Sequence, residues 1–446
     1  MTAYAHDRSG LAVRTSELYL LLLCGVLLGY VLMGKGFAYL GVPPLYIGEI
    51  AFLAGVVVFL RTRCLAASLA TLPALLLVAA LVWVLLRTLP FVGEYGFDAL
   101  RDSVIIMYGG FAFIVIGLLL EDGRRIKTVL RYYGIMLVSF PAMLVGFWLT
   151  KYWLDYIPLL YGPVPIVNIP ASAVGTHLAG AMVFVLIGYR KMSPLWVVVW
   201  FATLVLVGAT NRGATLAVII PVGFAMLMLG RFRLMLITAV TAVCILTVLY
   251  VVESSLGQYD EAANSIERSV SAHQIVENAK SIITQSGQQT DGTKQWRLNW
   301  WQIIIDDTIH GSNFWTGRGF GINLAVADGF LETNSSNDQP TRSPHNAHMT
   351  ILARAGVPGV VLWALVNVSW FGMLMGAMLT ACARGHREWA KLFLFVGCYA
   401  AAILINATFD VVLEGPMQGI WFWCLFGFGI GSVMIYRAQP FAESPR

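Results

Sequence analysis

The feature that most constrains this chain is a series of long apolar segments, each separated from the next by a short polar stretch. Twelve segments of about 16–25 residues are long enough to cross the hydrocarbon core of a bilayer. Composition agrees, because 58% of the 446 residues are hydrophobic and 12% are charged, whereas about 25% of an average soluble domain is charged. The sequence therefore predicts an all-α polytopic membrane protein. The predicted spans are residues 18–33, 40–60, 64–86, 103–120, 128–149, 173–189, 194–210, 213–230, 232–252, 356–381, 389–408 and 416–436.

The net charge of +5 is distributed across the predicted membrane and forms no patch suited to nucleic acid. With both termini in the cytoplasm, the cytoplasmic side carries 17 of the 29 Lys and Arg residues, the short opposite loops carry 5, and the long segment before the tenth span carries 7. An excess of basic residues marks the cytoplasmic loops of membrane proteins. We therefore expect a multi-pass protein of the plasma membrane with cytoplasmic termini and no nucleic-acid partner.

One long polar segment interrupts the spans. Residues 1–252 hold nine predicted spans, residues 253–355 form a large outer loop, and residues 356–446 hold three more spans and a cytoplasmic tail. Apolar residues at near-helical spacing predict an amphipathic helix over 261–286. A second helix is predicted to begin at Asp291 or Thr293, so we expect the loop to be partly helical.

Two arginines lie where the predicted spans reach the outer face. Arg212 occupies the tip of the hairpin between the seventh and eighth spans, where its guanidinium could either reach lipid headgroups or bind a phosphate in a cavity. Arg297 lies among Trp296, Trp300 and Trp301. Tryptophans of this kind usually anchor a helix at the membrane interface. The same arrangement would hold Arg297 at the depth of a lipid-linked phosphate.

Two histidines three residues apart, His345 and His348, stand where the outer loop meets the tenth span. A protein metal site needs three or four ligands. No third histidine is nearby, and all six cysteines lie in or at the ends of apolar spans, so we expect no metal and no cofactor. Neighbouring arginines would keep an imidazole uncharged and able to accept a proton, which makes His345 a candidate general base. For His348, packing within the bundle is the alternative.

Five further residues are candidates for accessory roles. Glu49 is an acid inside an apolar span, which indicates either function or pairing with an arginine of a neighbouring helix. Arg318 lies in "TGRGFG", which lacks the strand–turn–helix setting of a phosphate-binding loop and predicts a turn. Arg342, Asn346 and His348 surround the candidate base in the sequence.

Two of these stretches resemble the O-antigen ligase family of integral-membrane enzymes. "HNAHMTILARAGVPG" fits the family pattern His-[Asn/Ser/Gln]-x9-Gly-x-x-[Gly/Thr/Tyr], with His345, Asn346, Gly356 and Gly359 at its defined positions. "RGATL" fits the pattern Arg-x3-Leu over 212–216, at the expected outer hairpin. The twelve predicted spans, with a large loop between the ninth and tenth, also look like these ligases. The resemblance is best from about residue 194 to 380, and the first half of the chain matches in topology only.

The resemblance implies a GT-C-like membrane glycosyltransferase that is metal-independent and inverts the configuration of the transferred sugar. Its donor would be a glycan on undecaprenyl pyrophosphate, and its acceptor the lipid A core or another glycan, on the periplasmic side of the bacterial inner membrane. By the same resemblance His345 is the base, and Arg212 and Arg297 bind the pyrophosphate. Both substrates are lipids, which explains a titratable imidazole at the membrane surface.

Other functions remain open at this point. A polysaccharide polymerase would use the same chemistry with a second lipid-linked repeat as acceptor, in O-antigen or exopolysaccharide synthesis. A protein O-oligosaccharyltransferase would use a Ser or Thr hydroxyl as acceptor. A transporter could also have twelve apolar spans, but it would be expected to carry midplane charges and paired half-repeats. Here the candidate residues gather at the outer face, which favours transfer chemistry.

Overall fold

The computed structural model describes residues 2–161, 163–255, 275–276, 289–330 and 342–438, and these are mainly helical. Two short antiparallel hairpins, β1–β2 and β3–β4, are the sheets within that part of the chain. The prediction of an all-α polytopic membrane protein is therefore confirmed. The elements are α1 Thr2–Met33, α2 Lys35–Ala38, β1 Gly41–Val42, β2 Leu45–Tyr46, α3 Ile47–Arg61, α4 Leu65–Ser68, α5 Leu72–Thr88, the 3-10 helix η1 Leu89–Phe91, α6 Val92–Tyr95, α7 Phe97–Met107, α8 Gly110–Glu121, α9 Arg125–Met136, η2 Leu137–Ser139, α10 Phe140–Tyr152, η3 Leu154–Tyr156, β3 Leu159–Tyr161, β4 Val164–Pro165, α11 Ala171–Leu186, α12 Pro194–Thr210, α13 Arg212–Met228, α14 Phe232–Ser255, α17 Gln289–Thr308, α18 Leu324–Ala327, α19 Ala347–Ala383, α20 Arg387–Ala407 and α21 Pro416–Ala438.

Helices occupy all twelve predicted spans, but fewer of them are long enough to cross a membrane. Among the described residues seven helices meet the length and apolarity required, or eight if the pair α7 and α8, bent by 43°, is one span. Helices α11, α12 and α13 have 16 or 17 residues. Each therefore rises roughly 24–26 Å, less than the ~30 Å core of a bilayer. The predicted count of twelve spans is not confirmed.

Local capping determines where two of these short helices begin. The side chain of Asn211 accepts a hydrogen bond from the backbone N of Ala214 at 2.9 Å, which starts α13 and separates it from α12. The side chain of Ser193 accepts one from the backbone N of Trp196 at 3.2 Å at the start of α12. Such caps satisfy backbone groups that the helix itself leaves unpaired.

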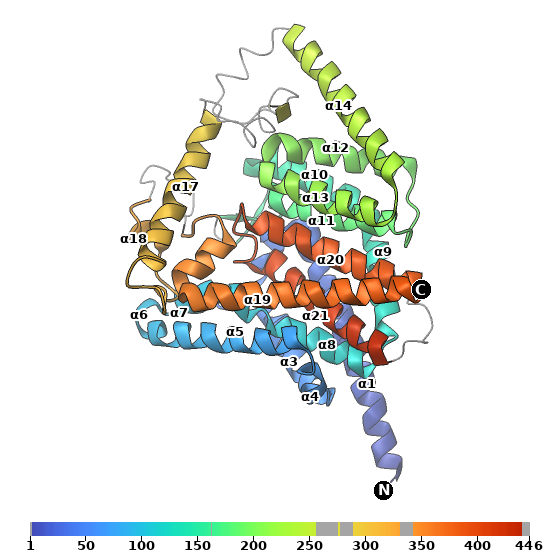
Figure 1. Cartoon of the computed structure of the whole chain (residues 1–446). Helices are drawn as coiled ribbons and strands as arrows, with labels where there is room; N and C mark the ends of the chain where they lie inside the picture. The colour runs from blue at the N-terminus through green and yellow to red at the C-terminus, as the bar shows by residue number, and fades with distance from the viewer. Residues whose placement is uncertain (1, 162, 256–274, 277–288, 331–341, 439–446) are drawn as a thin grey trace.

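The outer loop contains the second predicted helix. Helix α17 confirms that the loop contains this helix, but it begins at Gln289, before the predicted start at Asp291 or Thr293. The amphipathic helix predicted over 261–286 lies outside the described residues, apart from 275–276. Helices α17 and α18 lie at the same end of the bundle as α6 and α7, and α19 ends at the other (Figure 1).

Hydrogen bonds attach this outer layer to the membrane helices. The guanidinium Nε of Arg87, at the end of α5, donates to the carbonyl of Thr316 at 2.6 Å. One helical turn earlier, the indole of Trp83 donates to the carbonyl of Ala355 at 2.9 Å. Helix α5 also packs along α19. The residues between α17 and α19 are therefore fixed against the bundle at this end.

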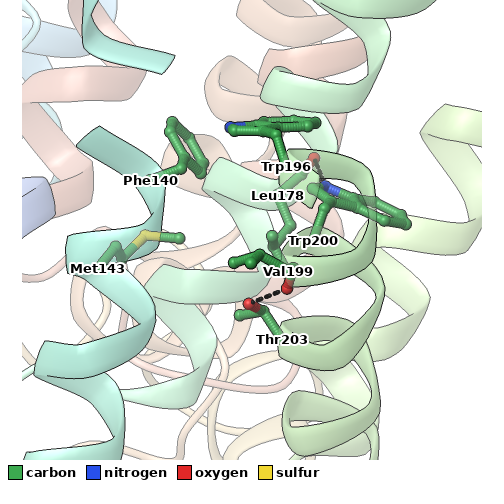
Figure 2. A pocket seen from close by; sticks show the side chains of 7 residues that line it. All are labelled: Phe140, Met143, Leu178, Trp196, Val199, Trp200 and Thr203. Carbon is green, nitrogen blue, oxygen red and sulfur yellow. Dashed lines mark hydrogen bonds between the residues drawn. The ribbon is translucent and has the colours of Figure 1, made fainter. Parts of the chain in front are cut away.

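The small cavity between α10, α11 and α12 illustrates how completely the core is packed (Figure 2). Its volume is about 10 Å³, the least that can hold a single water molecule. The Trp200 indole donates to the Leu178 carbonyl at 3.0 Å, and the Thr203 hydroxyl donates to the Val199 carbonyl at 2.7 Å (Figure 2). These polar groups are already paired, so this cavity is a packing gap and offers no ligand site.

Candidate functional site

His345 precedes α19 on backbone that few residues adopt. Its φ is 52°, in the left-handed region, where histidine occurs more often than most non-glycine residues. The next residue, Asn346, caps α19 by accepting hydrogen bonds from the backbone N of His348 at 2.9 Å and of Met349 at 3.2 Å. The His345 side chain is 30% exposed. It is therefore accessible to a substrate while its backbone is fixed.

Helix α17 supports the segment that carries His345. The indole of Trp301 donates to the carbonyl of Pro344 at 2.9 Å, and the ring of Trp296 lies 6.2 Å from the imidazole, centroid to centroid. Trp300 is fully buried and donates to a carboxylate oxygen of Asp328 at 2.7 Å. At least two of these three tryptophans therefore have partners within the protein, in addition to any contact with lipid headgroups.

A carboxylate faces His345 from the connection between α20 and α21. Oδ1 of Asp410 lies 3.6 Å from Nδ1 of His345, slightly beyond a direct hydrogen bond. Burial alone would raise the pKa of Asp410, but contacts with His345, Ser172 and the backbone N of Val411 outweigh it and lower the pKa. The carboxylate is thus ionised at neutral pH. Because Nδ1 faces Asp410, Nε2 is the nitrogen left to accept a proton.

Both candidate arginines approach the same connection. A guanidinium NH of Arg297 donates to the carbonyl of Phe409 at 2.9 Å. Arg212 is the first residue of α13, and its neighbour Gly213 lies so close to Phe409 that an added Cβ would be 2.6 Å from that side chain. The fold therefore gathers the three residues predicted from sequence around 409–410, from three separate parts of the chain.

His348 points into the bundle and uses both ring nitrogens. Its Nδ1 accepts a hydrogen bond from the indole of Trp363 at 3.0 Å, and its Nε2 lies 3.2 Å from the hydroxyl of Thr408. Since the indole can only donate, Nδ1 carries no proton and Nε2 carries one. This arrangement suits a neutral packing residue, the alternative considered from sequence.

The comparison with known families matches residues 197–364 to the family described as O-antigen ligase. This segment, which is less than half of the chain, is similar to the O-antigen ligase family and supports the resemblance seen in the sequence. The matched O-antigen ligase segment contains Arg212, Arg297 and His345 and ends before Asp410. No curated protein matches the chain. Together with the apolar helices, the match to the O-antigen ligase family supports an integral membrane protein of a glycan-transferring family.

The glycines of the O-antigen ligase pattern have structural reasons. Gly356 interrupts α19 with φ 70° and ψ −172°, and an added Cβ there would lie 2.7 Å from the carbonyl oxygen of Phe314. Gly359 lies against the membrane helix α5, where an added Cβ would be 3.3 Å from the indole nitrogen of Trp83. The spacing from His345 to these glycines therefore corresponds to the first turns of α19. These turns end at the break at Gly356, where the loop that contains Phe314 packs against the helix.

Two arginines of the same segment share one acid. Arg342 pairs with Asp98 at 3.2 Å and with Asp102 at 3.3 Å. Arg354, which is fully buried, pairs with Asp102 at 2.9 Å. Both acids belong to α7, so this cluster attaches the loop and α19 to the membrane helices. The accessory role of Arg342 in binding substrate stays a prediction.

The other accessory candidates also have partners in the protein. Arg318 pairs with Asp307 at 2.7 Å and with Asp328 at 2.5 Å, which closes the turn predicted for this stretch. Glu49 accepts a hydrogen bond from the phenol of Tyr108 at 2.5 Å, so tyrosine takes the place of the expected arginine. Neither arrangement tests a role in the reaction, which stays a prediction for both residues.

The sequence reasoning missed two acids in the α20–α21 connection, Asp410 and Glu414. The hydroxyl of Thr350 donates to Glu414 at 2.8 Å. Burial raises the pKa of Glu414, although Thr350 and the nearby charge of Arg354 oppose the shift. The available signal was "TFDVVLEGP", a short stretch with two acids between two predicted spans and on the same side as the other candidates. Nothing in that stretch indicates its partner.

The described residues include no group of three or more His, Cys, Asp or Glu side chains that could hold a metal ion. The expectation that no metal takes part in the reaction stays a prediction, since it concerns turnover.

Proposed function

We propose that this protein transfers a glycan en bloc from undecaprenyl pyrophosphate to a sugar hydroxyl of the lipid A core. The reaction would take place at the periplasmic face of the bacterial inner membrane. One observation carries the proposal. Asp410 faces His345, and its neighbour Phe409 accepts a hydrogen bond from Arg297 and packs against the start of α13, where Arg212 lies. The O-antigen ligase match supports the same class of reaction.

In the proposed step, Nε2 of His345 takes the proton of the acceptor hydroxyl. The hydroxyl oxygen forms a bond to the anomeric carbon from the face opposite the pyrophosphate, and the bond from that carbon to the phosphate oxygen breaks. The electron pair leaves with the pyrophosphate, so the configuration of the sugar inverts. Arg212 and Arg297 would stabilise the charge that develops on the leaving group.

Asp410 would orient the imidazole and stabilise its protonated form after the transfer. Its lowered pKa supports this role, because the carboxylate is available at neutral pH. A separation of 3.6 Å fits a resting site, since catalytic hydrogen bonds are often longer before substrate binds.

The test uses the purified full chain, a donor glycan on polyprenyl pyrophosphate and two competing acceptors, in buffer that contains a chelator. Product on lipid A core supports ligation. Extension of a second polyprenyl-linked glycan would assign the same chemistry to a polymerase. If neither acceptor receives the glycan, although donor and acceptors bind, the proposal is wrong.

A further inference from the structure

A second, much larger cavity lies away from the site, between α1, α9 and the buried helices α8, α20 and α21. Its volume is about 350 Å³, within the usual range of binding sites for small molecules. Its mouth opens on the lateral surface of the helix bundle, where Leu21 of α1 and Ile135 of α9 are each 53% exposed. Its floor is formed by the buried rings of Tyr399, Trp421 and Phe428.

The chemistry of the lining determines which molecules can occupy this cavity. Nearly all of it is apolar, and an apolar cavity offers water too few hydrogen-bond partners to remain filled. The cavity lies along membrane-spanning parts of α1, α9 and α21. Its mouth therefore faces the hydrocarbon of the bilayer, and a lipid chain is the available occupant.

The cavity is reached from the end of the bundle opposite His345. Helix α7 carries Asp102, which pairs with Arg354 near the site, and α8 continues the same bent span away from it. At the far end of α8, Arg125 pairs with Glu17 of α1 at 2.7 Å. Leu21 at the mouth follows Glu17 by one helical turn.

The two helices that border the mouth present basic residues at that far end. On α9, Lys127 and Arg131 are exposed and precede Ile135 by two turns and one turn on the same helix face. On α1, exposed Arg14 precedes Leu21 by two turns on the same face. Three exposed cations therefore lie one or two helical turns from the residues at the entrance of an apolar cavity.

The acids at this end have arginine partners. Glu17 and Glu121 both pair with buried Arg125, and Asp122 pairs with Arg124 at 2.8 Å. Basic clusters between membrane helices attract the phosphates of anionic lipids. The entrance is thus complementary in charge to an anionic headgroup, and the cavity is complementary to its acyl chain.

We propose that an anionic phospholipid binds here, with one acyl chain in the cavity and its phosphate against Arg14, Lys127 and Arg131. This lipid site is independent of the proposed glycan transfer. The lipid would close the gap that α1 leaves against α9 and so stabilise the fold.

The experiment compares thermal stabilisation of the delipidated full chain in detergent by phosphatidylglycerol and by phosphatidylcholine with the same acyl chains. Gly25 lines the cavity, and an added Cβ there meets no atom within 4 Å. Gly25→Phe should therefore place a ring in the cavity without a clash at Cβ. Gly372→Phe is the matched control, because that lipid-facing glycine also has open space. Ile135→Trp, at the mouth, is the second blocking variant. The contribution of the basic residues is tested with K127Q/R131Q. The control is R231Q/R233Q, which removes two exposed arginines at the start of α14.

We expect phosphatidylglycerol to stabilise the wild type and Gly372→Phe more than phosphatidylcholine does. Both blocking variants should lose the response to either lipid. K127Q/R131Q should bind phosphatidylglycerol about thirtyfold more weakly, as two basic residues near a headgroup imply, and R231Q/R233Q should not. Equal responses of the wild type to the two lipids, or a full response of both blocking variants, would overturn the proposal. So would displacement of phosphatidylglycerol by a stoichiometric amount of polyprenyl phosphate, which would assign the cavity to a prenyl chain.

Discussion

His345 is held by backbone in a conformation that costs free energy. A non-glycine residue at φ 52° costs of order 1–3 kcal/mol, and such residues cluster at active sites. Here the Asn346 cap on one side and the Trp301 hydrogen bond to Pro344 on the other stabilise the turn. The imidazole therefore has a defined position before substrate arrives, as a general base requires.

His345→Asn should retain donor binding and lose about 10²–10⁴-fold in turnover, the usual contribution of a general base. Asparagine tolerates left-handed backbone, so this variant separates the loss of the base from the loss of the turn. His348→Ala should mainly lower thermal stability, with turnover per folded molecule less affected. Turnover of the purified variants and donor affinity are measured separately. Near-normal turnover of His345→Asn, or a folded but inactive His348→Ala, would contradict the assignment.

Arg212→Ala and Arg297→Ala should each weaken donor binding by about 10- to 100-fold, because a charge-assisted hydrogen bond contributes ~1.5–3 kcal/mol. Replacement by Lys should restore binding only in part, since an ammonium lacks the planar pair of donors. Binding is measured with a polyprenyl pyrophosphate that bears a defined glycan. Full rescue by Lys at both positions would mean that only the positive charge matters there.

Asp410→Asn should lower turnover by about 10- to 100-fold, less than the ~10⁴-fold seen where a fully buried carboxylate orients a catalytic histidine. The acidic limb of the pH profile of kcat/KM should also move to lower pH, because an amide no longer stabilises the protonated imidazole. The lowered pKa of Asp410 reflects the same coupling. An unchanged pH profile together with reduced turnover would indicate a purely structural role.

Among the elements, α19 links the site to the membrane. It begins at the Asn346 cap, breaks at Gly356 and continues through the bilayer to Ala383. At the break the loop packs against it, and an added Cβ at Gly317 would lie 2.5 Å from Arg354 backbone atoms. Gly317 and Gly356 therefore allow two backbone segments to approach closely just beyond the turn at His345.

Gly356→Ala should lower the free energy of unfolding by roughly 1–3 kcal/mol, because alanine is strained at positive φ and its Cβ would contact the Phe314 carbonyl. Turnover should fall as well, since the loop that supports His345 is displaced. Gly372→Ala, on the same helix with nothing near its Cβ, is the control and should be neutral or slightly stabilising. Thermal unfolding in detergent provides the measurement, and equal midpoints for the two variants would contradict this account of the motif.

Across the whole molecule, α17 and the start of α19, which His345 precedes, lie at one end of the bundle, and α19 ends at the other (Figure 1). The distribution of basic residues predicts that the site end faces the periplasm, with 17 basic residues on the cytoplasmic side and 5 in the short outer loops. The orientation matters for function, because the proposed donor and acceptor meet on the outer leaflet.

A reporter that is active only in the periplasm should be active when fused near Asn323, which caps α18. The same reporter fused at Gly385, in the turn between α19 and α20, should be inactive, and a cytoplasmic reporter should give the reverse pattern. Periplasmic activity at Gly385 together with inactivity at Asn323 would invert the topology, and the proposed transfer chemistry would then face the wrong side of the membrane.

The sequence by itself determined the helical membrane fold, the approximate position of the apolar helices along the chain and the residues of the family pattern. These follow from local signals: the length of apolar runs, the spacing of His345 and its glycines, and Arg212 at a hairpin tip. Only the tertiary structure decided that Asp410 faces His345, that Tyr108 pairs with Glu49 and that His348 points into the bundle. Such contacts join residues far apart in the chain, and they depend on how whole helices pack. No local pattern of hydrophobicity or charge specifies that packing.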